Sequence, residues 1–514
     1  MKFPIGIQNF EKLREDSFIY IDKTKLVHRL VVNGGDYFLS RPRRFGKSLL
    51  ISTLEAYFSG NKEAFQGLAI ESLEKDWIQY PILHIDLNTE RYNSVEALAN
   101  KLETNLYEWE QLYGKSPVAN SFGTRFEYVI RKAFEKTGRR VVILVDEYDK
   151  PMLQAIGNND LQREFRNILK GFYGALKSCD HYIRFAFLTG VTKFGKVSVF
   201  SDLNNLQDLS MDKEYQSICG ITEEEIHQYF AEPVQQLAEE EGLTVEQTLQ
   251  KLKQLYDGYH FVAGGVGIYN PFSLLNTLKR KQFGSYWFET GTPTYLVELL
   301  QRKDYVLPNL TEEVATADML NSIDSFSDNP IPVIYQSGYL TIKGYDKEFE
   351  EYHLGFPNKE VEEGFTRFLL PFYTNAEHGK MPFSIASFVR DLRSGRPAQF
   401  MQRMESMFAD TDYRVVGDSE LYFQNAFYLL AKMMGFYTKV ERATSDGRMD
   451  MTIEAANNVY IFEFKLDGSA EAALKQIDEK GYATPFISKG CNIYKVGVNF
   501  SLKKRCIDGW KIAE

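Results

Sequence analysis

Cysteine is scarce in this chain, and the few cysteines form no pattern. Cys179, Cys219, Cys491 and Cys506 are scattered over 514 residues without the paired spacing of a metal-binding module. Such usage fits a protein kept in a reducing compartment. We therefore expect a cytoplasmic protein.

Long apolar runs and a surplus of positive charge are also missing. No stretch approaches the roughly 18 apolar residues that a membrane span needs, and residues 1–7 are too short an apolar region for a signal peptide. The net charge of −10 argues against a surface that is basic throughout, although local basic patches such as residues 503–505 survive this average. These absences argue against a membrane partner, and charge alone does not indicate nucleic acid.

What is present is the composition of an ordinary folded protein. Hydrophobic residues make up 44% of the chain and charged residues 25%, so nothing suggests disorder. A length of 514 residues is too great for one hydrophobic core, and roughly two to four domains are expected.

The first recognisable chemistry lies between a predicted strand at residues 37–39 and a predicted helix at residues 49–58. This order of strand, loop and helix is typical of a phosphate-binding loop. In such a loop Gly46 lets the backbone approach a nucleotide and Lys47 reaches the β- and γ-phosphates. Ser48 would ligate Mg²⁺ at the helix N-terminus.

The same loop departs from the usual pattern at one position. The pattern asks for glycine five positions before Gly46, where this chain has Arg41. We expect Arg41, Arg43 and Arg44 to supply positive charge where loop flexibility is missing. An exposed basic turn without a ligand is the alternative.

A second signal follows in a run of apolar residues that ends in two carboxylates. Residues 141–145 are apolar without alternation, which predicts a strand buried on both faces of a parallel sheet. The carboxyl end of such a strand is where α/β sheets place ligands. We expect Asp146 to hold Mg²⁺ through water beside Ser48, and Glu147 to polarise the attacking water. A core strand with a solvated acidic end is the alternative.

Further predicted strands alternate with helices, as a parallel sheet requires. Two of these strands cover residues 81–87 and 183–192. The second ends in hydroxyl groups, and we expect Thr189, or else Thr192, to sense the γ-phosphate. A hydroxyl that only satisfies backbone groups is the alternative. The polar loop at residues 200–206 resembles a conformational switch.

The middle of the chain predicts helices and a hairpin. Residues 220–257 have helical periodicity, with Thr222 as N-cap and Glu225 three residues later, which suits a helical lid. The aromatic residues between 256 and 300 lack accompanying lysine and arginine, so we expect them to pack and not to stack on bases. Residues 330–375 predict a helix followed by a hairpin, the outline of a winged helix that either binds DNA or packs on the lid.

A sharper pattern lies in the C-terminal region. Residues 447–454 and 459–466 predict two hairpin strands, and the turn between them puts Asp450 directly opposite Glu463. The Cβ atoms of such a pair lie about 5 Å apart, so the two carboxylates repel unless a cation offsets their charge. We expect Mg²⁺ to be that cation, with Lys465 on the same face to orient the nucleophile or neutralise the phosphate.

Two residues on neighbouring predicted helices would complete this site. Glu420 lies on the helix before the hairpin and Gln476 on the helix after it. A hairpin whose polar face is merely solvated is the alternative. The sequence Glu463, Phe464, Lys465, with Asp450 twelve intervening residues upstream, argues against that alternative.

Together these segments resemble a bacterial family that couples an AAA-like ATPase domain to a C-terminal PD-(D/E)XK nuclease-superfamily domain. The resemblance rests on the motifs RPRRFGKS, VDEYDKP, TGV, LNNL, GRMDMTIE and FEFK, and covers nearly the whole chain. It implies that Arg41 is a family trait and not a local loss. It also implies that the nuclease pattern falls on Asp450, Glu463 and Lys465. Gln476 matches a helix residue that the family frequently carries.

The expected fold is therefore α/β with four parts. These are an AAA-like P-loop ATPase domain with a parallel sheet at residues 1–220, a helical lid at 221–300, a winged-helix-like segment at 301–378 and a small α/β PD-(D/E)XK nuclease-like domain at 379–514. The expected cofactors are ATP and Mg²⁺. The expected partner is nucleic acid, DNA before RNA, and assembly into a homo-oligomer is left open.

Two functions from different classes follow from this architecture. The first is an ATP-driven, Mg²⁺-dependent nuclease, and the intact pair of carboxylates with its lysine favours it. The second is a nucleotide-dependent switch whose nuclease-like domain binds nucleic acid or a partner without cutting, and the acidic net charge of −10 favours that one.

Overall fold

The structure is a computed structural model, and it describes most of the chain. The described residues are 1–193, 206–287, 296, 300, 305, 307, 310, 313–320, 329–373, 381–408, 419–435, 439–445, 448–501, 503–504 and 506–514. For residues 381–384, 419–424, 439–445 and 448–450 it describes the backbone and not the side chains.

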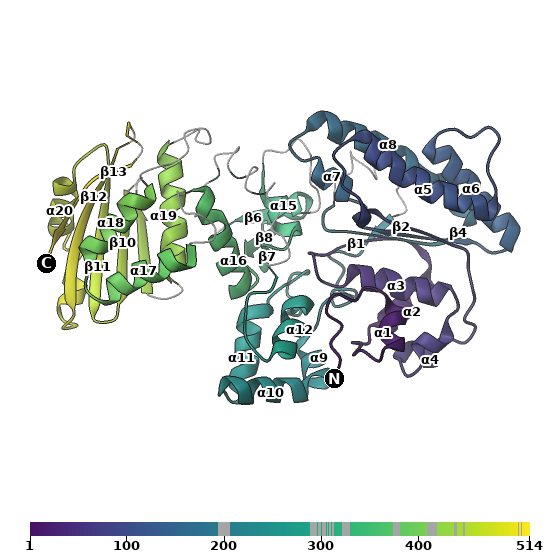
Figure 1. The fold of residues 1–514 in the computed structure, drawn as a ribbon, viewed down its shortest axis with the longest axis horizontal. Helices are drawn as coiled ribbons and strands as arrows, with labels where there is room; N and C mark the ends of the chain where they lie inside the picture. The colour runs from purple at the N-terminus through teal and green to yellow at the C-terminus, as the bar shows by residue number, and fades with distance from the viewer. Residues whose placement is uncertain are drawn as a thin grey trace. The chain divides into compact units, whose positions relative to one another are not determined.

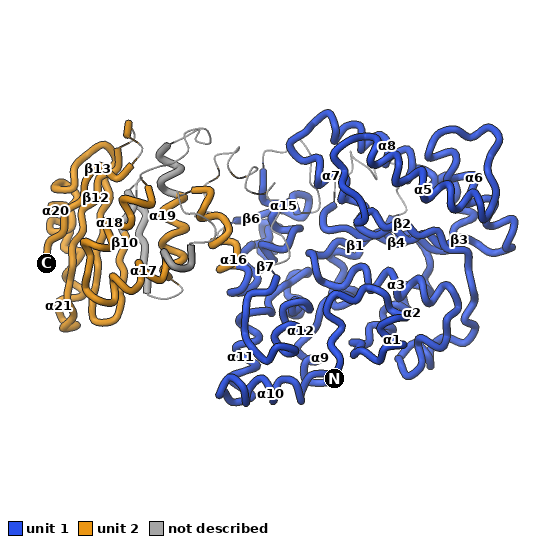
Figure 2. Tube along the Cα trace, in the orientation of Figure 1, with its two compact units in different colours: residues 1–291, 312–361 blue, residues 292–311, 362–514 orange. Residues whose placement is uncertain are grey.

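The chain forms two compact units (Figure 2). The first unit contains residues 1–291 and 312–361, and the second contains residues 292–311 and 362–514. A five-stranded parallel sheet lies in the first unit and a separate five-stranded mixed sheet in the second, which confirms the expected α/β class. Most of the expected lid and winged-helix-like segment falls inside the first unit. The four-part division remains a prediction.

The first unit begins with a sheet between two layers of helices. Its elements are α1 (Phe10–Glu15), α2 (Thr24–Asn33), β1 (Gly35–Ser40), α3 (Lys47–Phe58), α4 (Ala69–Leu73), β2 (Ile82–Asp86), α5 (Val95–Tyr113), α6 (Phe122–Thr137), β3 (Val141–Asp146), α7 (Lys150–Gln154), α8 (Asn159–Ser178), β4 (Ile183–Gly190) and β5 (Leu206–Asp208). Three 3₁₀ helices accompany them, η1 (Lys62–Phe65), η2 (Leu87–Thr89) and η3 (Asp180–Tyr182). Helices α5, α6 and α8 lie on one side of the sheet and α1 to α4 on the other (Figure 1).

The strand order determines which strand ends lie side by side. The order is β2-β3-β4-β1-β5 with every pair parallel. All six residues of β3 are buried, as the unbroken apolar run predicts. Because β4 lies between β1 and β3, its carboxyl end lies between the loop after β1 and the carboxylates after β3. In this register Thr189 of β4 is paired with Leu39 of β1.

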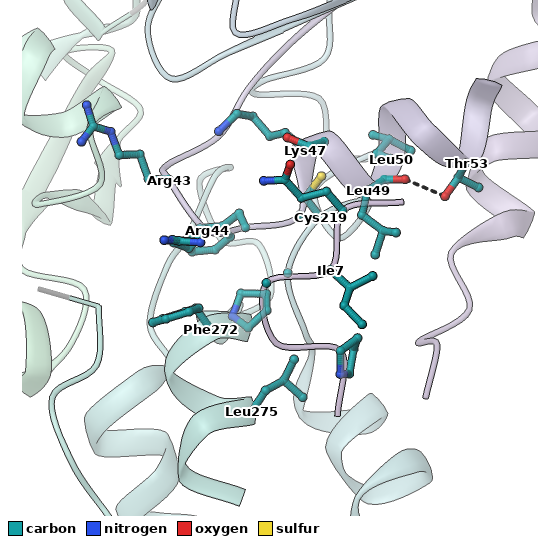
Figure 3. Close-up of a pocket in the computed structure, with 18 of the residues that line it drawn as sticks. Ile7, Arg43, Arg44, Lys47, Leu49, Leu50, Thr53, Cys219, Phe272 and Leu275 are labelled. Carbon is teal, nitrogen blue, oxygen red and sulfur yellow. Dashed lines mark hydrogen bonds between the residues drawn. The ribbon is translucent and has the colours of Figure 1, made fainter. Parts of the chain in front are cut away.

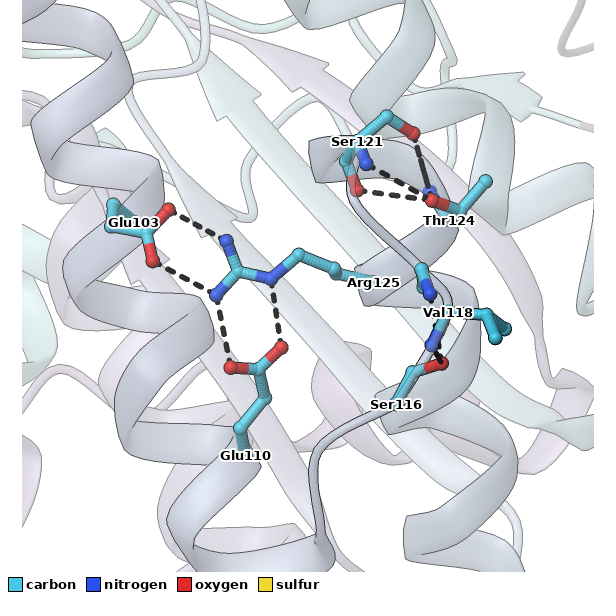
Figure 4. A network of polar contacts seen from close by, with 8 residues as sticks. Glu103, Glu110, Ser116, Val118, Ser121, Thr124 and Arg125 are labelled. Atoms are coloured by element: carbon cyan, nitrogen blue, oxygen red, sulfur yellow. Dashed lines mark hydrogen bonds and ion pairs between the residues drawn. The ribbon is translucent and has the colours of Figure 1, made fainter.

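A partly buried ionic network joins α5 and α6 (Figure 4). The guanidinium of Arg125 on α6 donates to Glu110 through Nε at 2.8 Å and to Glu103 through Nη1 at 2.6 Å, both on α5. The hydrogen bond to Glu110, and after it the one to Glu103, raises the pKa of Arg125 well above its ordinary value. Helix α6 starts at a capping box in which Ser121 and Thr124 exchange hydrogen bonds. Both features fix α6 beside α5 over the sheet.

A small helical subdomain follows within the first unit. It contains α9 (Glu223–Tyr229), α10 (Ala231–Glu241), α11 (Val245–Tyr256) and α12 (Pro271–Arg280) around a core of their apolar residues. Thr222 and Glu225 form the predicted capping box at the start of α9. Phe272 and Phe283 are partly exposed, but the other described aromatic residues between 256 and 287 are buried, which confirms packing for them. They include Tyr256, Tyr259, Phe261, Tyr269, Tyr286 and Trp287.

The segment expected to resemble a winged helix has the predicted order of elements. It contains β6 (Val314–Thr316), α14 (Ala317–Leu320), α15 (Ile331–Gln336), β7 (Thr341–Asp346), β8 (Glu351–Gly355) and α16 (Lys359–Leu369), which is followed by η6 (Leu370–Phe372). The three strands form an antiparallel sheet in the order β6-β8-β7. The sequence predicts the turn of this hairpin at residues 343–351, and the structure shortens it because β7 continues to Asp346. The predicted switch loop at 200–206 lies outside the described residues except for Leu206.

The second unit is built on a mixed sheet. Its elements are α17 (Met381–Arg393), α18 (Pro397–Phe408), α19 (Ser419–Gly435), β9 (Lys439–Ser445), β10 (Arg448–Ala455), β11 (Asn458–Leu466), α20 (Ala470–Glu479), α21 (Thr484–Ile487), β12 (Asn492–Ser501) and β13 (Cys506–Ala513). The strand order is β13-β12-β11-β10-β9, with β11 and β12 parallel and the other pairs antiparallel.

The two faces of β11 are covered by different helices. Phe462 and Phe464 contact Phe400 of α18 and Phe427 of α19. Ile461, on the opposite face, belongs to a core with residues of α20 and α21. The alternation of β11 therefore follows the prediction. Among the described residues, no helix is long and apolar enough to cross a membrane.

Candidate functional site

A cavity of about 670 Å³ lies beside the loop after β1 (Figure 3). A volume of this size is within the range of small-molecule binding sites, about 300 to 1,000 Å³. Apolar residues from the N-terminal segment and from α12 form one part of its wall, among them Ile7, Phe272 and Leu275. Charged residues from the loop and the strand ends form another part, so the cavity has a polar end and an apolar end.

The loop has the geometry that a phosphate site requires. Gly46 has φ of 95° and directly precedes α3, and no atom lies within 4 Å of the place where a Cβ would stand. Glycine is required at this position for its backbone conformation, because residues with a side chain rarely adopt such a left-handed φ. The ammonium of Lys47 donates to the carbonyl oxygens of Arg41 at 3.0 Å and Pro42 at 3.2 Å. Ser48, in the first turn of α3, lines the cavity together with Gly46 and Lys47.

Arg41 does not line the cavity, which corrects the expectation that it supplies charge there. Its guanidinium donates to the carbonyl oxygens of Ser40 and Ser210, each at 2.9 Å, and of Tyr215 at 3.3 Å. It also stacks 3.9 Å from the ring centroid of Phe261. The missing glycine is tolerated because the positive φ angles of the loop fall at Arg44 and Gly46 and not at residue 41.

The other two arginines of the loop line the cavity. Arg43 and Arg44 are both exposed. Arg44 has φ of 69°, and its guanidinium lies 4.8 Å from the ring centroid of Phe272 on α12. The loop and the helical subdomain therefore meet at the cavity through a cation–π contact.

Of the predicted site residues at the strand ends, Glu147 lines the cavity, whereas Asp146 and Thr189 do not. Asp146 and Thr189 are buried, and the Thr189 hydroxyl donates to the Asp146 carboxylate. Glu147 has φ of 52° and lines the cavity. The alternative sensor Thr192 instead donates to Asp149 at 2.6 Å. Burial raises the pKa of Asp149 to about 6.

Sequence reasoning missed several residues of this cavity. Asn88, Lys150 and Phe272 all line it. Lys150 carried a usable signal, since it follows Glu147 by three residues in a motif already singled out. The other two carried none, because their approach to the loop depends on how distant segments pack.

The C-terminal site forms on the face of β11 that α20 covers. The register pairs Asp450 with Glu463, as predicted, around a two-residue turn that is shorter than the expected loop. The Glu463 carboxylate has no solvent exposure, and its Oε1 accepts from the ammonium of Lys465 at 3.1 Å. The same ammonium donates to the side chain of Gln476 on α20. The alternative, a hairpin whose polar face is merely solvated, is therefore wrong for Glu463.

The site's metal-binding capacity rests on oxygen ligands. Glu463 and the residue paired with it across the ladder, Asp450, are carboxylates, the ligand type that Mg²⁺ prefers. The side chains of Asp450 and Glu420 lie outside the described residues. Among the described side chains, no group of three His, Cys, Asp or Glu is arranged to hold a metal. The donor chemistry present fits Mg²⁺.

Comparisons with known proteins find both expected domains. A family model described as "Predicted AAA-ATPase" matches residues 4–200, and one described as "PD-(D/E)XK nuclease superfamily" matches residues 418–510. A protein of Azotobacter chroococcum mcd 1, "Uncharacterized protein in vnfD 5'region", is 36% identical over 526 residues that cover 99% of this chain and 98% of that protein. The chain therefore belongs to the family that joins a predicted AAA-ATPase domain to a PD-(D/E)XK nuclease-superfamily domain.

Proposed function

We propose that this protein binds and hydrolyses ATP in the cavity of the first unit and cleaves nucleic-acid phosphodiesters with the second. One observation carries the proposal. In each unit, side chains from distant parts of the chain that suit phosphate chemistry lie together. Lys47, Ser48 and Glu147 line one cavity, and Lys465 bonds both Glu463 and Gln476.

In the ATPase unit each residue has a distinct part. Lys47 exchanges its bonds with loop carbonyls for bonds with phosphate oxygens, while Arg43 and Arg44 add positive charge at the cavity wall. Glu147 orients the attacking water and accepts its proton. Thr189 holds Asp146 in place. Mg²⁺, with Ser48 and Asp146 nearby, would neutralise charge on the phosphates.

In the nuclease-like unit the lysine is the central group. Lys465 neutralises negative charge that develops on the phosphate, and Gln476 keeps its ammonium directed to the site. Mg²⁺ held by Asp450 and Glu463 would activate a water. The proposed substrate is DNA before RNA, and the proposed location is the cytoplasm. Assembly of the chain into a homo-oligomer is left open.

The ATPase is tested with two variants and one control. Lys47→Ala removes a phosphate ligand, so we expect a large loss of ATP affinity in calorimetry. Glu147→Gln should keep ATP bound and slow turnover by about 10²-fold or more, because the water loses its base. Lys132→Ala, which removes an exposed lysine paired with Glu135 on α6, serves as control. Equal ATP affinity in wild type and Lys47→Ala would contradict the proposed ATPase.

The nuclease is tested by incubating the full chain with single- and double-stranded DNA, ATP and Mg²⁺. We expect cleavage that EDTA stops and that Asp450→Ala, Glu463→Gln and Lys465→Ala each abolish. Lys511→Ala, which removes an exposed lysine paired with Glu471, should cut like wild type.

A second function is favoured by the acidic net charge of −10 and by the ion pair already formed between Lys465 and Glu463. In this alternative the second unit binds nucleic acid or a partner without cutting, under control of the nucleotide. Nucleotide-dependent binding in a gel-shift assay, with intact DNA in all conditions, would select it.

A further inference from the structure

Lys150 stands on the same cavity wall as Glu147. It is the first residue of α7, and its backbone N–H donates to the Glu147 carbonyl at 3.1 Å. Both side chains line the cavity, as does Lys47 of the phosphate loop. The tight turn after β3 thus brings a cation to the part of the cavity where the proposed base lies.

The ammonium of Lys150 is held by neutral oxygens. It donates to the backbone carbonyl of Asn88 at 2.7 Å and to the side-chain oxygen of the same residue. Asn88 belongs to η2, directly after β2, and lines the cavity itself. Because β2 and β3 are neighbours in the sheet, this contact joins their carboxyl ends.

The bonding of Lys150 matches that of Lys47. Within the part of the chain that the structure describes, no carboxylate forms an ion pair with either lysine, and each ammonium is bound to carbonyl oxygens only. Lys23, a third lysine of the cavity, is different because Glu225 neutralises it at 2.5 Å. Lys47 and Lys150 are therefore the two lysines of this wall whose positive charge no described carboxylate neutralises, so both can bind an anion.

We propose that Lys150 is a second phosphate-binding cation, which acts from within the same chain on the γ-phosphate of the nucleotide. The inference rests on the proposed ATPase function. Hydrolysis forms a bond from a water oxygen to the γ-phosphorus and breaks the bond from that phosphorus to the bridging oxygen. The water proton goes to Glu147, and ADP leaves with the electron pair.

Negative charge develops on the transferring oxygens during this step, and a cation fixed beside them stabilises that charge. Lys47 approaches from the phosphate loop, while Lys150 lies on the turn that carries Glu147. Its contribution is therefore expected mainly in the transition state and less in ground-state binding. Since the cation belongs to the same chain, the turnover per chain should not depend on protein concentration.

The test compares Lys150→Met, which keeps the length of the side chain without its charge, with Lys150→Arg and with the control Lys132→Met. Calorimetry measures the affinity for ADP with Mg²⁺ and for ADP with aluminium fluoride, which imitates the transferring phosphoryl group. Steady-state kinetics measures turnover at several protein concentrations.

We expect Lys150→Met to lower turnover by about 10²-fold, the effect typical of losing one group that stabilises developing charge. The affinity for ADP–aluminium fluoride should fall in proportion, while that for ADP changes by less than about threefold. Lys150→Arg should restore part of the turnover, because it restores the charge.

Two results overturn the inference. The first is unchanged turnover in Lys150→Met, and the second is an equal loss of affinity for ADP and for ADP–aluminium fluoride, which would make Lys150 a structural residue. In either case a wild type that hydrolyses ATP leaves the proposed function standing. If the wild type does not hydrolyse ATP, the proposed function and the inference both fail.

Discussion

At the scale of single residues, what a side chain does here depends on where its neighbours let it point. Arg41, Arg43 and Arg44 are close in sequence and equal in charge, yet the first is buried and the other two are exposed. Burial lowers the pKa of Arg41 to about 10, so it remains charged at neutral pH. Its charge stabilises the loop through backbone carbonyls rather than through a ligand.

This placement makes a prediction for Arg41→Ala. The change leaves the carbonyl oxygens of Ser210 and Tyr215 without their charged donor, so the free energy of unfolding should fall by about 2 to 3 kcal/mol. ATP affinity, measured at a temperature where the variant is folded, should stay within a few-fold of wild type. Lys47→Ala is the matched comparison. It should lose ATP affinity and keep its stability, whereas Arg41→Ala should lose stability and keep its ATP affinity. A loss of ATP affinity in Arg41→Ala without loss of stability would contradict this.

Asp36 on β1 predicts a pH dependence. It is buried, and its burial, with a smaller effect of Asp180, raises its pKa from 3.8 to about 6. Between these values the folded state binds more protons than the unfolded state, so this residue's contribution to stability falls as pH rises. A shift of this size corresponds to at most about 3 kcal/mol.

The expected outcome concerns Asp36→Asn. This variant has no proton to lose, so its free energy of unfolding relative to wild type should rise between about pH 4 and pH 6 and then level off. Urea titrations of both proteins across this range measure the difference. A difference that does not change with pH would show that Asp36 titrates normally.

At the scale of elements, close packing between a strand and a helix places the C-terminal site. Gly497 of β12 is paired with Glu463 of β11. A Cβ at Gly497 would lie 2.3 Å from the carbonyl oxygen of Ala470 and 2.9 Å from the backbone nitrogen of Leu474, both on α20. The absence of a side chain therefore lets α20 approach closely enough for Gln476 to reach Lys465.

Gly497→Ala should push α20 away from the sheet. We expect a loss of about 1 to 3 kcal/mol of stability, the usual effect of adding a group to a packed interface, and a strong loss of nuclease activity. Gly509→Ala is the control, because it lies in the same sheet and nothing lies within 4 Å of its added Cβ. If the two variants cut DNA equally well, the spacing of α20 does not limit the site.

At the scale of the whole molecule, each of the two compact units has its own sheet and its own candidate site. A ligand that binds one unit stabilises that unit by mass action. Two cores in one chain also make a single two-state transition unexpected.

Calorimetry of the full chain should therefore show more than one unfolding transition. Mg²⁺ with ATP should raise the midpoint of one transition and leave another unchanged, with a stabilisation of about 2.7 kcal/mol when the ATP concentration is one hundred times Kd. Lys47→Ala should remove this shift, whereas Glu463→Gln should retain it. A single transition that ATP moves as a whole would contradict independent units.

Much of this organisation could be predicted from local sequence. The unbroken apolar run of β3 predicted a buried strand because only a strand covered on both faces can hide every side chain. The register that pairs Asp450 with Glu463 followed from the hairpin, since a turn between adjacent strands determines which residues face each other. The capping box at Thr222 is equally local, because its hydrogen bonds join residues three positions apart.

Only the tertiary structure decided how the sites are completed. Arg41 turns away from the cavity because carbonyl oxygens near residues 210–215 accept its guanidinium. Lys150 contacts Asn88 across neighbouring strands. Gln476 was expected at its site from the sequence, but its hydrogen bond with Lys465 forms because α20 covers β11 closely. Such contacts depend on sheet order and on the distance between packed elements. Neither quantity is contained in the spacing of residues along the chain.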